Sequence, residues 1–115
     1  MAIRSYSVEN PSRGRYIVTW AGLLNGDSGE PLILSKACKS IRFNGTFGAG
    51  GTIIFEGSND TSSPVFATLV DLQGNAISKT TAGIENVAVS VQQVRPRVTA
   101  GDGTTNLTAQ ILIEI

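Results

Sequence analysis

The residues that could do chemistry in this chain are few, and their spacing does not assemble a reaction centre. The sequence contains no histidine, so neither a Ser-His-Asp triad nor a histidine metal site can form. Glu56 and Asp60 come closest to the paired carboxylates of a glycosidase, but no neighbouring residue would raise the pKa of either carboxyl group as a catalytic acid requires. We therefore expect a protein that is not an enzyme.

Cys38 is the single cysteine, which excludes an intramolecular disulfide and fits a reducing compartment. Lys36 and Lys39 lie beside it and could lower the pKa of the thiol, as in reactive cysteines. No partner base accompanies it, however, so the pattern favours a small residue at the core or its boundary.

Two further patterns resemble ligand sites without matching them. The glycine-rich run over residues 45–51 is followed by neither Lys-Ser/Thr nor a helix, so it predicts a turn and not a phosphate loop. Asn25, Asp27, Glu30 and Asp60 offer oxygen ligands for calcium, but their spacing matches no calcium-binding loop. We expect no cofactor and no metal.

Composition places the chain among small all-β proteins. Its 115 residues, 41% hydrophobic and 16% charged, fit one globular domain, and the 13 glycines and many β-branched residues indicate strands joined by tight turns. The formal net charge is zero, so no overall field attracts nucleic acid or a membrane surface. No apolar run has the length of a signal peptide or a membrane span.

The stretch over residues 40–60 predicts a central hairpin with a three-residue loop at 48–50. Apolar and polar residues alternate on both sides of the loop. This register sets Phe43 opposite Phe55 and Arg42 opposite Glu56.

Other strands are predicted at residues 16–21, 31–35, 65–70 and 106–115, with 65–70 buried. A second hairpin would pair Val98 with Leu107, and Pro96 makes its first strand an edge or a bulged strand. The expected fold is a single-domain antiparallel β-sandwich of jelly-roll type, with about eight strands in residues 16–115.

Residues 1–15 differ from the rest and predict an extended N-terminal arm, with a poorly ordered terminus as the alternative. The arm is basic and also carries an apolar alternation. On the domain itself, two apolar residues are expected on outward faces and could form a contact surface. The candidate partner-binding residues are therefore Ile3, Arg4, Tyr6, Val8, Arg13, Ile54 and Leu112.

Four stretches carry a resemblance to a known group: GLLNGDSGEPL (22–32), GTFGAGGTIIFEGSND (45–60), DLQGNAIS (71–78) and VRPRVTAGDGTTNLTAQILI (94–113). In this order and spacing they resemble small tailed-bacteriophage virion proteins, a group that includes capsid decoration (cement) proteins. The resemblance implies a structural protein on the capsid surface that binds the major capsid protein, as an oligomer for which a trimer is favoured. A phage tail or neck protein is an alternative.

The phrase FEGSND (55–60) also resembles discoidin-type sugar-binding jelly rolls. That resemblance implies a carbohydrate-binding module as a further alternative. The aromatic residue that usually follows this turn is missing, and an exposed aromatic platform would be the feature that distinguishes such a module.

Overall fold

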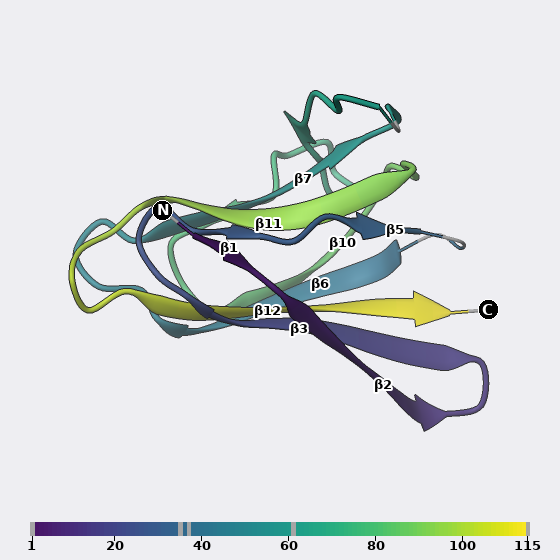
Figure 1. Ribbon diagram of the computed structural model, residues 1–115, viewed down its shortest axis with the longest axis horizontal. Coiled ribbons are helices and arrows are strands. Elements are labelled where there is room, and N and C mark those ends of the chain that lie inside the picture. Colours follow the sequence, from purple (N-terminus) through teal and green to yellow (C-terminus); the bar gives the residue numbers. More distant parts are fainter. Residues whose placement is uncertain (1, 35, 37, 61, 115) are drawn as a thin grey trace.

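The computed structural model describes residues 2–34, 36, 38–60 and 62–114, which form strands, turns and loops without a helix (Figure 1). No described segment is therefore a helix able to cross a membrane. Seven strands have four or more residues: β2 (Tyr6–Ser12), β3 (Arg15–Leu23), β6 (Cys38–Thr46), β7 (Thr52–Ser58), β10 (Gly83–Asn86), β11 (Gln93–Ala100) and β12 (Asn106–Glu114). Five have two residues each: β1 (Ile3–Arg4), β4 (Ser28–Gly29), β5 (Leu32–Ile33), β8 (Ala67–Thr68) and β9 (Ser78–Lys79). Ser35 and Ile115, which end two of the predicted strands, lie outside the described residues.

The strands form two sheets that pack face to face. Sheet A has the order β1-β4-β11-β7-β8, with β5 beside β11 and β9 beside β7. Sheet B has the order β10-β6-β12-β3-β2. Successive long strands cross from one sheet to the other, from β6 to β7 and again from β10 to β11 to β12. The predicted all-β sandwich of jelly-roll type is thus confirmed, although the β1–β4 pair is parallel.

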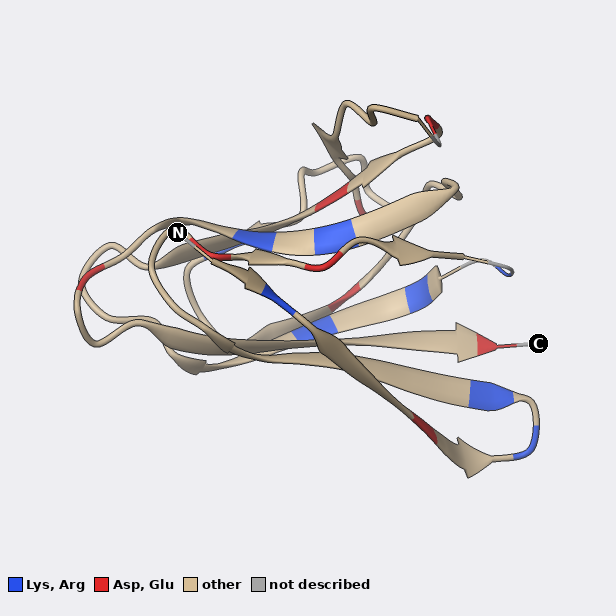
Figure 2. Cartoon of the chain, viewed as in Figure 1, with Lys and Arg blue, Asp and Glu red and all other residues tan. Residues whose placement is uncertain are grey.

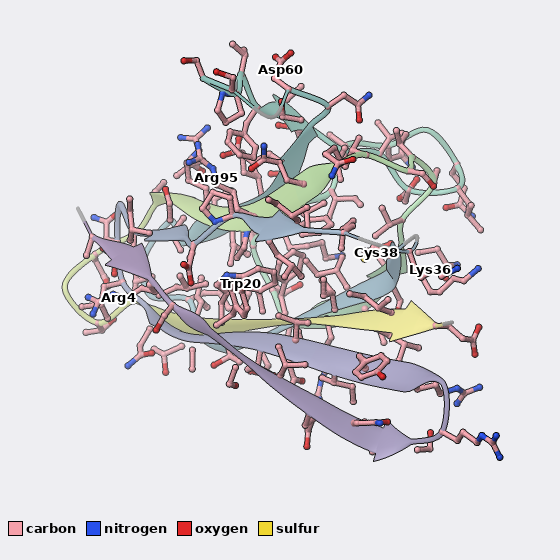
Figure 3. The ribbon with its side chains drawn as sticks, turned by 45° about the vertical axis from the view of Figure 1, so that its right-hand side comes forward. Arg4, Trp20, Lys36, Cys38, Asp60 and Arg95 are labelled. Atoms are coloured by element: carbon pink, nitrogen blue, oxygen red, sulfur yellow. The ribbon has the colours of Figure 1, made fainter. Side chains whose placement is uncertain are left out.

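The core lies between the sheets because each long strand turns its apolar alternate residues inward. Trp20 and Phe43 from sheet B meet Phe55 from sheet A, and all three are fully buried. Figure 3 shows Trp20 between the two layers. Burial of each of these side chains contributes roughly 1.5–3 kcal/mol to folding.

The predicted central hairpin is wrong. Both of its strands exist, but β6 pairs with β10 and β12 in sheet B, whereas β7 pairs with β11 in sheet A. Arg42 therefore lies opposite Gln110, and Glu56 lies opposite Arg95.

The same correction applies to the predicted hairpin of Val98 and Leu107. β11 and β12 belong to different sheets, and both residues are buried between them. An alternating pattern specifies which side chains face inward, and two strands in facing sheets satisfy that demand as well as two hydrogen-bonded neighbours do.

The loops of these two connections fasten to each other at one end of the sandwich. The Asp102 carboxylate accepts hydrogen bonds from the Ala49 amide at 2.8 Å and the Thr104 amide at 2.8 Å. The Thr105 hydroxyl donates to the Phe47 carbonyl at 2.7 Å. We call these contacts between the two loops the loop lock. Gly48 has φ +75°, and a side chain there would collide with Asp102 and Thr105, so the loop lock requires glycine at this position.

The prediction that Pro96 makes its strand an edge or a bulged strand needs correction. β11 lies between β4 and β7 and is not an edge, and its register irregularity falls between Val98 and Ala100. Pro96 lies in the gap between the residues that pair with the short strands β5 and β4, so its missing N–H leaves no ladder bond unmade on that side. The buried strand predicted over residues 65–70 is wrong. Only Ala67–Thr68 is a strand, and Val65 is 77% exposed, because this segment runs along the outer edge of sheet A.

The predicted arm is built into the sandwich in this structure. β1 pairs with β4 in sheet A, and after one residue β2 pairs with β3 in sheet B. Residues 13–14 form the turn between β2 and β3, so a boundary between residues 15 and 16 would cut this hairpin. The apolar alternation read in the arm is that of an edge strand, whose Tyr6 packs edge-on against Trp20 at 5.9 Å.

Candidate partner-binding surface

Three of the seven predicted partner-binding residues are engaged within the fold. Tyr6 packs on Trp20, Arg4 binds Asp27, and Ile54 is only 8% exposed. Ile54 lies on the outer side of sheet A between its register partners Arg97 and Ser78. The outward face was predicted correctly for Ile54, but its neighbours cover it.

The other four predicted residues are open to solvent to differing degrees. Ile3 and Val8 are exposed and Arg13 lies at the tip of the β2–β3 hairpin, which projects from the body of the molecule (Figure 1). Leu112 is half-buried on the outer face of sheet B. The structure does not bring these four together into one site.

Asp27 fastens the N-terminal segment to the sandwich. Its carboxylate accepts hydrogen bonds from the Ala2 amide at 2.9 Å, Arg4 Nε at 2.8 Å and the Leu24 amide at 2.9 Å. Burial raises the pKa of Asp27, but the hydrogen bonds from Leu24, Arg4 and Ala2 lower it by more, so the pKa lies below its ordinary value of 3.8. Asp27 therefore holds residues 2 and 4 against the turn that follows β3.

The outer face of sheet A carries a buried carboxylate between two arginines. Glu56 Oε1 accepts hydrogen bonds from Arg95 Nε at 2.7 Å and Arg97 Nε at 3.1 Å. The Arg95 guanidinium also lies 4.0 Å from the centre of the Phe66 ring. The predicted Arg42–Glu56 contact is thus replaced by a cluster that joins β7 to β11 and to the loop before β8; Figure 3 labels its Arg95.

The outer face of sheet B carries a partly apolar groove. This shallow groove of about 240 Å³ lies between β3, β12, β6 and β10. Ile17 and Leu112 line it with apolar side chains, Ile84 is 66% exposed at one side, and Arg42 and Gln110 supply polar groups. In Figure 2 the charged residues on the strands of this sheet appear as separate coloured bands on the ribbon.

Sequence reasoning found only Leu112 of this groove. Ile17 is out of phase with the core residues Val18 and Trp20 of β3, so its outward position could be predicted. No residue of β10 is among the core residues, so Ile84 carries no such signal. The groove itself depends on strand order, because Ile17 and Ile84 come from strands separated by β12 and β6.

Cys38 and the acidic loop residues do not form a reactive or metal-binding site in the described part of the chain. Cys38 is buried, and burial raises the pKa of its thiol to about 12 despite its hydrogen bond to the Ser40 carbonyl. The structural boundary role predicted for this cysteine agrees with that environment. No cluster of three potential metal ligands occurs among the described residues.

No protein-family model matches this chain, and no curated protein matches it in sequence. Among solved structures, the SPBc2 prophage-derived protein YomS has a TM-score of 0.63 at 10% identity, with 91% of this chain and 98% of that chain covered. Peruvianin-I from Thevetia peruviana latex, described as a cysteine peptidase, has a TM-score of 0.45 at 16% identity, with 88% of this chain and 50% of that chain covered. A cupin domain from Bordetella pertussis has a TM-score of 0.41 at 11% identity, covering 96% of this chain and 92% of that chain. The likeness to YomS establishes a shared fold.

Proposed function

We propose that this protein is a bacteriophage capsid decoration protein that binds the outside of the head and stabilises it across contacts between coat subunits. The sequence resemblance over residues 20–113 and the fold shared with a prophage-derived protein support a phage origin. The role is mechanical and needs no catalytic group. The domain adds contacts that must break before the shell can open.

The observation that carries the proposal is the free edge of sheet B. β2 is a seven-residue strand that pairs on one side with β3, and no strand of the described residues pairs with its other side. A free edge can accept a strand from another protein through main-chain hydrogen bonds. Val8, 56% exposed, and the hairpin tip at Arg13 lie beside this edge and would contact the major capsid protein.

The carbohydrate-binding alternative has less support. All seven aromatic side chains are buried or half-buried, including Tyr6 against Trp20 and Phe66 beneath Arg95. Sugar-binding jelly rolls need an aromatic face that a sugar ring can reach. The tail or neck alternative is distinguished by experiment.

The test is to compare particles with and without this protein. Particles that lack it should assemble but lose their genome at a lower temperature, and added purified protein should restore their heat resistance. A Val8→Asp/Arg13→Glu variant should bind the lacking particles more weakly, whereas an Ile33→Asp variant, which alters an exposed residue on sheet A, should bind normally. Unchanged heat resistance would refute the decoration role, and a block in tail attachment would assign the protein to the neck or tail.

A further inference from the structure

We infer that the outer face of sheet B binds a second copy of this chain about a twofold axis parallel to β12. This inference concerns self-association in solution and does not depend on binding to a capsid. It rests on how the register arranges apolar and charged side chains on this face.

Two rows of side chains cross the face, one residue from each of the five strands. Because cross-strand partners share a face, the pairings place these residues side by side. The first row, from β2 to β10, is Ser7, Thr19, Gln110, Arg42 and Ile84. The second row, in the same direction, is Glu9, Ile17, Leu112, Ser40 and Asn86.

The two rows contain one acid and one base, on opposite sides of the central strand. Glu9 is on β2 at one edge, and Arg42 is on β6 beyond β12. Both are exposed, and neither forms an ion pair with any residue that the structure describes. By contrast, Arg95 and Arg97 on sheet A share a carboxylate.

A twofold axis along β12 satisfies both charges at once. The rotation places the β2 side of one copy over the β10 side of the other, without shifting the copies along the strands. Glu9 of each copy therefore comes diagonally opposite Arg42 of the other. Sheets that pack face to face lie about 10 Å apart, a distance that Arg and Glu side chains can bridge together. The symmetry forms this ion pair twice.

The same rotation fills the groove. Ile17 of one copy comes opposite Ser40 of the other, between Leu112, Arg42 and Ile84, which line the hollow. Leu112 meets its own equivalent on the axis. At the end of β12, Glu114 already has its own counter-ion, Arg15, at 3.0 Å. The face is therefore complementary to itself in charge, and Ile17 supplies an apolar side chain for the groove.

The inference predicts a twofold dimer, in place of the trimer that the family resemblance implies. A second copy accounts for the acid, the base and the groove together.

A charge-swap experiment on the full-length protein tests this contact without any capsid. Sedimentation equilibrium should show a dimer of the unaltered protein, and Arg42→Glu or Glu9→Arg alone should weaken dimerisation at least tenfold. The double variant Arg42→Glu/Glu9→Arg should recover most of the affinity. Arg13→Glu, also an exposed arginine without a described ion pair but located at the hairpin tip, should leave dimerisation unchanged.

All four variants should unfold at nearly the same temperature as the unaltered protein because the altered side chains are on the surface. A monomer at millimolar concentration, equal dimerisation of all variants, or failure of the double variant to recover would overturn the inference. A protein that is monomeric in solution and buries this face only when bound to capsid particles would also overturn the inference. Loss of capsid binding with an intact charge-swapped dimer would instead refute the decoration role alone.

Discussion

The environment of Glu56 differs from the expected contact with Arg42 on a polar face. Its side chain is 4% exposed on the outer face of a sheet, and it is held there by Arg95 and Arg97. A buried carboxylate with two guanidinium partners is stable only while the set is complete, since removal of one charge leaves the others desolvated.

We therefore predict that Glu56→Gln lowers the free energy of unfolding by about 1.5–3 kcal/mol, as measured by urea denaturation. Arg97→Gln should cost no more than about 1 kcal/mol, because the Arg97 side chain is 40% exposed and water screens its charge. Equal losses from the two variants would contradict the screening of the Arg97 charge by water.

Asp27 gives the stability of the protein a specific dependence on pH. Its folded-state pKa lies below 3.8, so the folded state binds the proton less readily than the unfolded state does. The contribution of Asp27 is complete above the ordinary carboxyl range and is lost as the pH falls through the lower, folded-state pKa. We predict that Asp27→Asn lowers stability at pH 7 and flattens the fall in stability below pH 3.8. Parallel pH profiles of the two proteins would contradict this assignment.

At the level of elements, sequence reasoning located most long strands and their inward faces. Val18 and Trp20 on β3, and Leu107 and Ile111 on β12, face the core as their alternation indicates. It failed on strand partners, because two strands on either side of a glycine loop can pair or can cross between sheets with the same faces buried. The choice is made by contacts distant in sequence, such as the close approach of Gly45, at φ +114°, to the backbone of β12.

The candidate surface shows the same limit. Ile54 and Leu112 occupy equivalent outward positions in their strands, yet Ile54 is covered and Leu112 opens into a groove. Only the neighbouring strands distinguish them. Alternation predicted the face of each residue, whereas the strand order determined its exposure.

The loop lock joins the β6–β7 loop to the β11–β12 loop, and its loss should affect only hydrogen exchange nearby. The Asp102 carboxylate is held by the Thr104 side chain and by the Ala49 and Thr104 amides, and these hydrogen bonds lower its pKa to about 2. Asp102→Ala should therefore speed hydrogen exchange of the Ala49 amide at least tenfold while the Phe55 amide, which bonds to the Ile77 carbonyl, keeps its protection. An Ala49 amide that exchanges at the same rate in both proteins would show that the lock does not order this loop.

At the scale of the whole molecule, the N-terminal segment joins the two sheets along one side. β1 lies in sheet A and β2 in sheet B, so the chain crosses between the layers at residue 5. Besides the Asp27 contacts, the Ala2 carbonyl accepts from the Ser28 amide at 3.0 Å and the Arg4 carbonyl from the Glu30 amide at 2.7 Å. This strap spans the open side of the sandwich next to Trp20 (Figure 3).

Deletion of residues 2–4 distinguishes a strap from an arm that belongs on a neighbouring subunit. The deletion removes hydrogen bonds from both β4 and Asp27, so we predict a loss of about 2 kcal/mol and a fall in Tm of roughly 8 °C in the free protein. Ile3→Ser is the matched control. Its side chain is 70% exposed, so the substitution should change the stability by less than about 0.5 kcal/mol. A truncated protein with an unchanged Tm would mean that the segment contributes nothing to the isolated domain, and its place would then have to be sought on a partner.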